Sequence, residues 1–286
     1  MTQHDASHRS LLTRTRRTGG AGSTEFLPRG EVVLEVRKLN KSFGPVHVLH
    51  DIDFSVRAGE VIALVGDNGA GKSTLVKCFA GINSIDSGEI YYGGRPVTIH
   101  DPRDAAALGI EFVYQDLALA DNLDITQNMF LGRELRRYGF MDDGEMERKA
   151  RQTLESLSVR TVSSVRQLVA NLSGGQRQTV AIAKAVLWNS KVVFLDEPTA
   201  ALGVAQTRQV LDLVRRLADQ GHGVVLISHN MNDVMEVADR VAALYLGRIA
   251  AEVETKDSST TQIVELITAG RSGDLGLTAA TANETM

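Results

Sequence analysis

A glycine-rich segment that follows a short apolar run constrains the fold of this chain more than any other sequence feature. Residues 61–65 read VIALV, a pattern typical of a strand buried on both faces of a parallel sheet. Gly66, Gly71, Lys72 and Ser73 follow with the spacing G-x-x-x-x-G-K-[ST], and a helix is predicted to begin there. Because glycines let the backbone wrap a phosphate and a helix N-terminus attracts negative charge, the segment predicts a phosphate-binding loop.

The side chains of this loop indicate a nucleoside triphosphate with a magnesium ion. Lys72 supplies a mobile positive charge for the β- and γ-phosphates, and the Ser73 hydroxyl can bind Mg²⁺. The loop residues expected to contact the nucleotide are Gly66, Asp67, Asn68, Gly69, Ala70, Gly71, Lys72, Ser73 and Thr74. The single cysteine, Cys78, lies in the helix that follows and is expected to be a small core residue rather than a reactive thiol.

Apolar runs and helical patterns alternate along the rest of the chain. Residues 191–195 and 223–227 are two further strands of the buried type. An apolar stripe at helical spacing separates them and ends at Gly221, which predicts a βαβ unit. Residues 116–187 lack such strands and hold predicted helices, one of them with Asp142 as N-cap at capping-box spacing. The sequence therefore predicts an α/β fold with a mainly parallel sheet, an N-terminal β region and a helical subdomain.

The limits of the folded part follow from composition. A β-rich run at residues 32–36 opens it, and one domain is expected over residues 31–270. Residues 1–30 are basic and rich in Ser, Thr and Gly, and residues 271–286 lack apolar periodicity. Both ends are therefore expected to be disordered tails.

Charge and hydropathy argue against two classes of protein. The chain has 31 Lys and Arg against 35 Asp and Glu, for a net charge of −4, whereas proteins that bind nucleic acids through phosphates are usually basic. No apolar run approaches the ~18 residues that span a bilayer. We expect no nucleic-acid partner and no membrane span in this chain, although it can sit against a membrane protein.

Two carboxylates follow the apolar strand at residues 192–195. Asp196 and Glu197 stand where ligands bind in α/β sheets, at the carboxyl end of a buried strand. Asp196 is placed to hold Mg²⁺, and Glu197 is a candidate general base for the water that attacks the γ-phosphate. A solvated acidic turn is the alternative reading, which the phosphate-binding loop upstream makes less attractive.

A second glycine-rich helix start is predicted about a hundred residues beyond the first. Ser173, Gly174, Gly175 and Gln176 open a helix with an apolar face, and a hydroxyl with bare N–H groups at a helix start can hold an anion. One nucleotide need not use both helix starts of one chain. A site shared by two chains would explain the duplication, whereas an N-capped surface helix is the simpler alternative.

Together these motifs resemble those of the ATP-binding subunits of ABC transporters. Residues 66–73 resemble the Walker A motif, residues 192–197 resemble Walker B with its following glutamate, and residues 172–176 resemble the family signature. The resemblance covers about residues 31–270. It implies a P-loop NTPase core of the ABC type, with a helical subdomain at about residues 116–187, and ATP hydrolysis with Mg²⁺.

Three weaker motifs gain meaning only from this resemblance. Gln115 falls at the Q-loop position and is expected to contribute to catalysis and to the Mg²⁺ site. His229 falls at the switch-histidine position and is expected to be catalytic, together with Lys72 and Glu197. Phe43 falls where the family stacks an aromatic ring on adenine. Without the resemblance, His229 and Gln115 would be ordinary polar residues and Phe43 a core aromatic.

A finer resemblance, to importers of monosaccharides such as ribose, xylose and fructose, lies in GDNGAGKST, in DEPTAALG and in the segment around Gln115. It implies a peripheral subunit on the cytoplasmic face of the plasma (inner) membrane that works with two permease subunits. In the family, the Gln115 segment and the helical subdomain dock on the permease, and an extracytoplasmic binding protein delivers the solute. The sequence itself carries no sugar chemistry.

Two features depart from the family pattern. Many sugar-importer ATPases fuse two such domains, whereas this chain has one, so a second copy of the chain is expected as partner. Many ABC proteins also have Asp where this chain has Gly203, which puts the contact of that Asp across the dimer in doubt.

Three alternatives remain open at this stage. One is an ABC importer for another small solute. Another is a soluble ABC ATPase that acts on ribosomes or DNA, but such proteins usually carry two ATPase domains or long coiled coils. The last is a regulatory module that binds ATP without hydrolysing it, against which the intact Lys72, Asp196, Glu197 and His229 argue.

Overall fold

The computed structural model describes residues 26–159 and 161–276. The longer strands are β1 (Val32–Phe43), β2 (Val46–Arg57), β3 (Val61–Gly66), β4 (Ser87–Tyr92), β5 (Arg95–Val97), β6 (Ile110–Val113), β9 (Val192–Asp196), β10 (Gly223–Ile227), β11 (Arg240–Tyr245) and β12 (Arg248–Glu254). The α-helices are α1 (Lys72–Phe79), α2 (Pro102–Ala107), α3 (Ile125–Phe130), α4 (Asp143–Ser156), α5 (Gly174–Val186), α6 (Val204–Asp219), α7 (Met231–Val237) and α8 (Thr260–Ala269). Two short hairpins, β7 (Arg136–Arg137) with β8 (Phe140–Met141) and β13 (Arg271–Ser272) with β14 (Leu275–Gly276), complete the strands.

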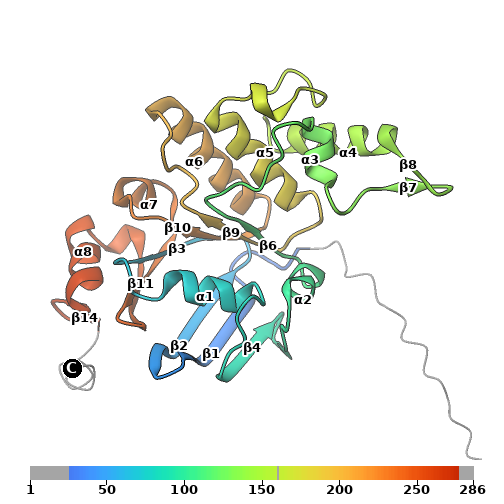
Figure 1. Cartoon of the computed structure of the whole chain (residues 1–286). Helices are drawn as coiled ribbons and strands as arrows, with labels where there is room; N and C mark the ends of the chain where they lie inside the picture. The colour runs from blue at the N-terminus through green and yellow to red at the C-terminus, as the bar shows by residue number, and fades with distance from the viewer. Residues whose placement is uncertain (1–25, 160, 277–286) are drawn as a thin grey trace, which may run out of the picture.

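A six-stranded sheet in the order β12-β11-β3-β10-β9-β6 forms the centre of the molecule (Figure 1). All neighbouring strands in it are parallel except β11 and β12. The strands predicted at residues 61–65, 191–195 and 223–227 are β3, β9 and β10 of this sheet, with one-residue differences at some ends. The predicted α/β class with a mainly parallel sheet is confirmed.

The two faces of this sheet bury two different cores. Alternate residues of one strand point to opposite faces, so Ala63 belongs to one core and its neighbours Ile62 and Leu64 belong to the other. Helices α5 and α6 cover one face, while α1 and the N-terminal strands cover the other (Figure 1). This double coverage explains why the central strands are apolar at every position.

Helix α6 joins two neighbouring parallel strands of this sheet, as predicted, and helix α1 directly follows the loop after β3. Helix α6 lies between the parallel strands β9 and β10, and Gly221 follows its end with a left-handed φ of +99°. Helix α1 buries Phe79 and Cys78 against the second core. Burial raises the pKa of the Cys78 thiol to about 11, as befits the predicted core residue.

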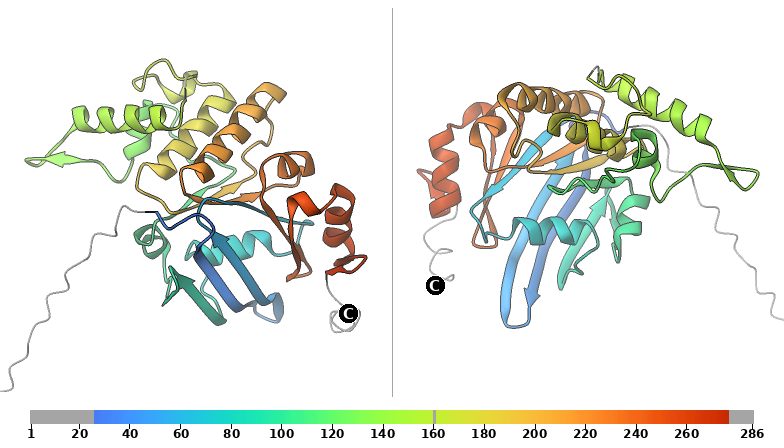
Figure 2. Two further views of the ribbon diagram at one scale, coloured as in Figure 1. Left: turned by 180° about the vertical axis from the view of Figure 1, so that it is seen from behind. Right: turned by 45° about the horizontal axis from the view of Figure 1, so that its top comes forward.

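The N-terminal β region is a separate four-stranded antiparallel sheet in the order β2-β1-β4-β5. β1 and β2 are long, shift register at several points, and pack their apolar residues against one face of the main sheet (Figure 2). The turn between them leaves Phe43 paired with Val46 near its tip.

The segment between β6 and β9 holds α3, α4 and α5 and lies beside the central sheet (Figure 1). Asp142 caps α4 by accepting a hydrogen bond from the Glu145 N–H at 3.1 Å. The reciprocal half of the predicted capping box is wrong: the Glu145 carboxylate pairs with Arg148, and the Asp142 N–H donates to the carbonyl of Leu135. The β7–β8 hairpin, which the sequence analysis did not predict, projects from this segment (Figure 2).

Both predicted tails include residues that contact the folded part of the chain. Phe26 packs edge-on against His222 with ring centroids 4.8 Å apart, and the Gly30 N–H donates to the carbonyl of Ala58. At the other end, β13 and β14 form a hairpin that buries Ser272. The expectation of disorder is therefore wrong for residues 26–30 and 271–276. The remaining parts of the predicted tails, 1–25 and 277–286, lie outside the described residues.

Candidate nucleotide-binding and hydrolytic site

A cavity of about 320 Å³ lies at the carboxyl ends of the central strands. Of the residues predicted for the site, it brings together Asp67, Asn68, Gly69, Gly71, Lys72, Ser73, Thr74, Gln115, Asp196, Glu197 and His229. These residues come from four separate stretches of the sequence that meet at one edge of the sheet. Parallel strands produce this meeting, because all of their carboxyl ends lie on the same side.

The loop from β3 to α1 has a backbone shape that depends on its glycines. Gly69 and Gly71 have left-handed φ values of +86° and +109°, which disfavour any residue with a Cβ. A Cβ on Gly71 would lie 2.8 Å from a methyl group of Leu49, and one on Gly66 would lie 2.5 Å from the carbonyl oxygen of Leu244. The loop therefore keeps this path, packed against Leu49 and Leu244, only because glycines occupy these places.

Lys72 lies across the mouth of this loop. Its ammonium group donates to the carbonyl oxygens of Gly66 at 2.6 Å and Asp67 at 3.0 Å. Burial lowers the pKa of Lys72, while the nearby carboxylates of Glu197, Asp67 and Asp196 act in the opposite direction. The lysine is thus held over the loop by acceptors that phosphate oxygens can replace.

Asp196 and Glu197 end β9 as predicted. Burial raises the pKa of Asp196, the neighbouring Glu197 adds to that rise, and Lys72 opposes it. Because a cation would offset the cost of burying this carboxylate, the site suits a metal ion bound with phosphate. Glu197 has a φ of +50°, and its N–H donates to the carbonyl of Ile227 at 2.9 Å.

Glu197 and His229 are in direct contact. The distance between His229 Nδ1 and Glu197 Oε1 is 2.7 Å, while 77% of the His229 side chain is exposed. Gln115 lies on the same cavity, two residues beyond the end of β6. The arrangement places a carboxylate, an imidazole and an amide around one cavity beside the loop.

The cavity lining also differs from the predicted set. Val48 and Ile227 line it, and the sequence analysis missed both, because an apolar strand residue carries no motif signal. Gly66, Ala70 and Phe43 are not among its lining residues. Phe43 is 46% exposed at the β1–β2 turn, and the Lys41 ammonium lies 5.3 Å from its ring centroid.

The second glycine-rich helix start, Ser173–Gln176, is not part of this cavity in the single chain. Ser173 and Gln176 form a capping box at the start of α5. A Cβ on Gly174 would lie 3.2 Å from Leu202, and one on Gly175 would lie 3.0 Å from Gln206. Close packing against the start of α6 is therefore one reason for these glycines, alongside any contact with an anion.

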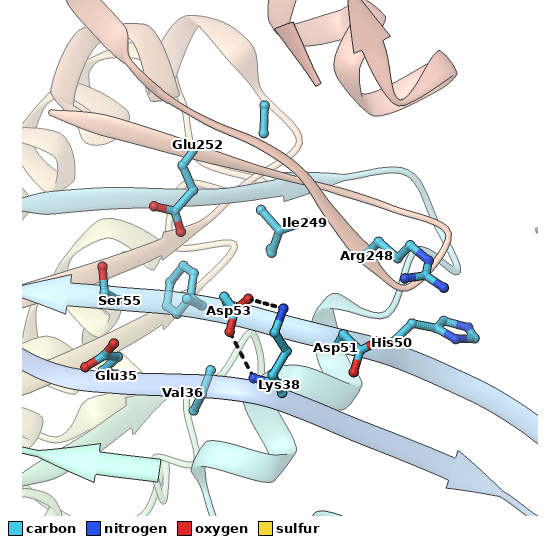
Figure 3. A pocket seen from close by; sticks show the side chains of 12 residues that line it. Glu35, Val36, Lys38, His50, Asp51, Asp53, Ser55, Arg248, Ile249 and Glu252 are labelled. Carbon is cyan, nitrogen blue, oxygen red and sulfur yellow. Dashed lines mark hydrogen bonds and ion pairs between the residues drawn. The ribbon is translucent and has the colours of Figure 1, made fainter. Parts of the chain in front are cut away.

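A larger cavity of about 560 Å³ lies between β1, β2 and β12, away from the loop (Figure 3). Charged side chains line it, and Lys38 and Asp53 pair across it at 3.0 Å. It has no glycine-rich loop, and the predicted site residues lie elsewhere. Size alone therefore does not identify the functional site in this molecule.

A family model and two known proteins are similar to this chain. The ABC transporter family model matches residues 49–200. The xylose/arabinose import ATP-binding protein of Sulfolobus acidocaldarius is 42% identical, over 86% of this chain and 97% of that protein. The fructose import ATP-binding protein of Rhizobium meliloti is 45% identical, over 84% of this chain and 95% of that protein. Both relatives are thus about as long as this chain.

Solved structures share the fold. A nucleotide-free ATP-binding cassette from an ABC transporter superimposes with a TM-score of 0.70 at 25% identity, over 78% of this chain and 92% of that one. A dimeric bacterial ABC transporter cassette gives a TM-score of 0.65 at 23% identity, over 78% and 98% of the two chains.

In the described part of the chain, no helix is both long and apolar enough to cross a bilayer. The phosphate-binding loop, the carboxylates that end β9 and the near full-length relatives lead to one family. The chain belongs to the ATP-binding, ATP-hydrolysing subunits of the ABC transporter family.

Proposed function

We propose that this chain is the subunit that hydrolyses ATP to drive an importer for a monosaccharide. The main support for ATP hydrolysis is that Lys72, Glu197 and His229 line one cavity. The substrate class is supported by the relatives named for import of xylose, arabinose and fructose, of which this chain spans nearly the whole length.

The loop residues Gly66–Thr74 hold the triphosphate through backbone N–H groups, and Lys72 neutralises charge on the β- and γ-phosphates. Phe43 stacks on the adenine from the β1–β2 turn. Ser73, Gln115 and Asp196 would hold Mg²⁺, which when bound supplies charge neutralisation at the phosphates. The buried Asp196, with its raised pKa, fits this assignment because a cation favours its charged form.

Glu197 accepts the proton of the attacking water, and His229 orients that water and the γ-phosphate from the other side. The 2.7 Å contact between the two side chains supports this shared role. Because the His229 side chain is largely exposed, the site of a single chain is open to solvent. Hydrolysis would therefore need a second surface that covers the site and excludes water.

The missing surface is a second copy of this chain. Ser173, Gly174, Gly175 and Gln176 of one copy would close over the ATP held by the loop of the other, which would use both glycine-rich helix starts. The dimeric cassette of the same fold supports this arrangement. At position 203 a Cβ would meet nothing within 4 Å, so the absence of the family's Asp is not forced by packing in this chain.

Closure of the ATP-bound dimer would be passed to two permease subunits, and hydrolysis would reset it. The β7–β8 hairpin supports a docking role for the helical subdomain, because Tyr138 is 89% exposed and Phe140 is 79% exposed. The chain would lie on the cytoplasmic face of the plasma (inner) membrane, and an extracytoplasmic binding protein would deliver the sugar to the permease.

The test has two arms. Purified full-length protein should hydrolyse ATP in the presence of Mg²⁺, with Lys72→Ala as the inactive control. Purification of the tagged chain from membranes should recover a permease and a solute-binding protein, and direct binding of sugars to that binding protein should show a preference for monosaccharides. Preference for another class of solute would keep the ATPase assignment and reject the sugar.

A further inference from the structure

A buried carboxylate on α7 joins two loops of the hydrolytic site. Asp233 is only 5% exposed, and both of its oxygens are used by neutral side chains. The Thr199 hydroxyl donates to Oδ2 at 2.6 Å, and the Asn230 amide donates to Oδ1 at 2.9 Å. No motif marked Asp233 in the sequence.

The two donors stand beside the two groups that meet above the phosphate-binding loop. Thr199 is two residues after Glu197, and Asn230 directly follows His229. Two further hydrogen bonds fix the position of Asn230. Its N–H donates to the Ser228 hydroxyl, and its side-chain oxygen accepts from the Asn232 N–H. A single carboxylate thus links the backbone after Glu197 to the backbone after His229.

Both loops need such a link. Glu197 has a left-handed φ of +50°, a conformation that persists only where the surroundings enforce it. The His229 side chain is largely exposed, so packing does not fix its position. Their 2.7 Å contact therefore depends on how the two loops are held.

We propose that Asp233 is a positioning residue that holds Glu197 and His229 in the relative position needed for the attack of water on ATP. The inference rests on the proposed roles of Glu197 and His229 in hydrolysis. Because a displacement of ~1 Å in a catalytic group can cost about 100-fold in rate, a link of this kind controls turnover without touching the nucleotide.

The predicted signature is a loss of kcat with little change in KM. Asp233→Ala removes both acceptors and should lower kcat for ATP by about 100-fold. Asp233→Asn keeps one acceptor oxygen and should retain more activity. Thr199→Val removes one hydrogen bond and should give a loss of about 10-fold, with KM for ATP within about 2-fold in all three because the phosphate-binding loop is untouched.

Asp239 provides a matched control. Its carboxylate accepts hydrogen bonds from the Val61 N–H at 2.8 Å and from Arg215 at 2.9 Å. Asp239 follows the C-terminal end of α7, and Val61 begins β3, whose other end leads into the site. Both Asp239→Ala and Asp233→Ala should lower the melting temperature, but Asp239→Ala should leave kcat within about 2-fold of wild type.

The outcomes separate the possibilities. Wild-type kcat in both Thr199→Val and Asp233→Asn would overturn the positioning role, even if Asp233→Ala fails to fold. Equal kcat losses in the Asp239 and Asp233 variants would reduce Asp233 to a general stability residue. Glu197→Gln is measured in parallel: if it keeps wild-type turnover, the proposed hydrolytic role fails, whereas an inactive Glu197→Gln beside active Asp233 variants rejects this inference alone.

Discussion

The two glycine-rich helix starts of this molecule look alike in sequence and differ in structure. Helix α1 begins after Gly71, a left-handed residue, and in the described part of the chain no side chain caps it. Helix α5 begins after Ser173, whose hydroxyl accepts from the Gln176 N–H, while the Gln176 side chain accepts from the Ser173 N–H. One helix start is left open, and the other is closed by its own residues.

This difference indicates that the two helix starts have different roles in binding. The uncapped start of α1 lies in the cavity with Lys72 and can bind phosphate within one chain. The start of α5 has its donors partly satisfied and lies outside that cavity. This helix start is stable without a ligand, and in our proposal it contacts ATP only when two copies of the chain associate. Substitutions at the two helix starts should therefore have different effects on ATP binding and turnover.

The largest effect is expected from Lys72→Ala. Loss of the ammonium group removes the charge that offsets the transferred phosphoryl group, and turnover should fall by at least about 1000-fold. A colorimetric phosphate assay on purified protein checks it, with circular dichroism to show that the fold is intact. Turnover close to that of wild type would reject the role of Lys72.

A smaller effect is expected from Ser173→Ala. ATP affinity of the single chain should be unchanged, since α5 lies outside the cavity, while turnover should fall by about 100-fold because one donor to the shared ATP is lost. Isothermal titration and a turnover assay measure the two quantities.

Ser259→Ala is the matched control, because Ser259 and Gln262 form the same capping box at the start of α8. Each substitution should cost about 1 kcal/mol of folding free energy, and only the Ser173 variant should lose turnover. An equal effect on turnover would show that Ser173 acts through helix stability alone.

The smallest effect is expected from Phe43→Ala, which tests the other side of the comparison. In our proposal, adenine stacks on Phe43 of the chain that holds the phosphates, and such stacking is worth about 1–3 kcal/mol by analogy with base–aromatic pairs. ATP affinity should fall by about 10-fold already in the single chain, and inorganic triphosphate should bind as before. Unaltered ATP affinity would return Phe43 to an ordinary aromatic of the β1–β2 turn.

The sequence predicted those parts of the fold and site whose signal is local. The apolar strands, the glycine spacing of the loop and the carboxylates after β9 each lie within a few consecutive residues, and each is found where it was expected. The helix end at Gly221 was predictable for the same reason, because only a glycine readily takes its φ of +99°.

Features that depend on distant segments were not predictable. Val48 lines the cavity only because β2 passes beside the loop, and Gln206 explains Gly175 only because α6 packs on α5. The link from Thr199 to Asp233 joins residues far apart in the sequence. The ordered ends at Phe26 and Ser272 also arise from tertiary contacts that composition does not reveal.

The central claim, that ATP is shared by two copies of this chain, is tested most directly with Glu197→Gln. The amide keeps the size of the side chain but does not accept the proton of the attacking water, so bound ATP persists. Because a ligand that binds the dimer stabilises it by mass action, size-exclusion chromatography with light scattering should give a dimer in Mg-free ATP and a monomer without nucleotide. A variant that binds ATP tightly and remains monomeric would contradict the shared site.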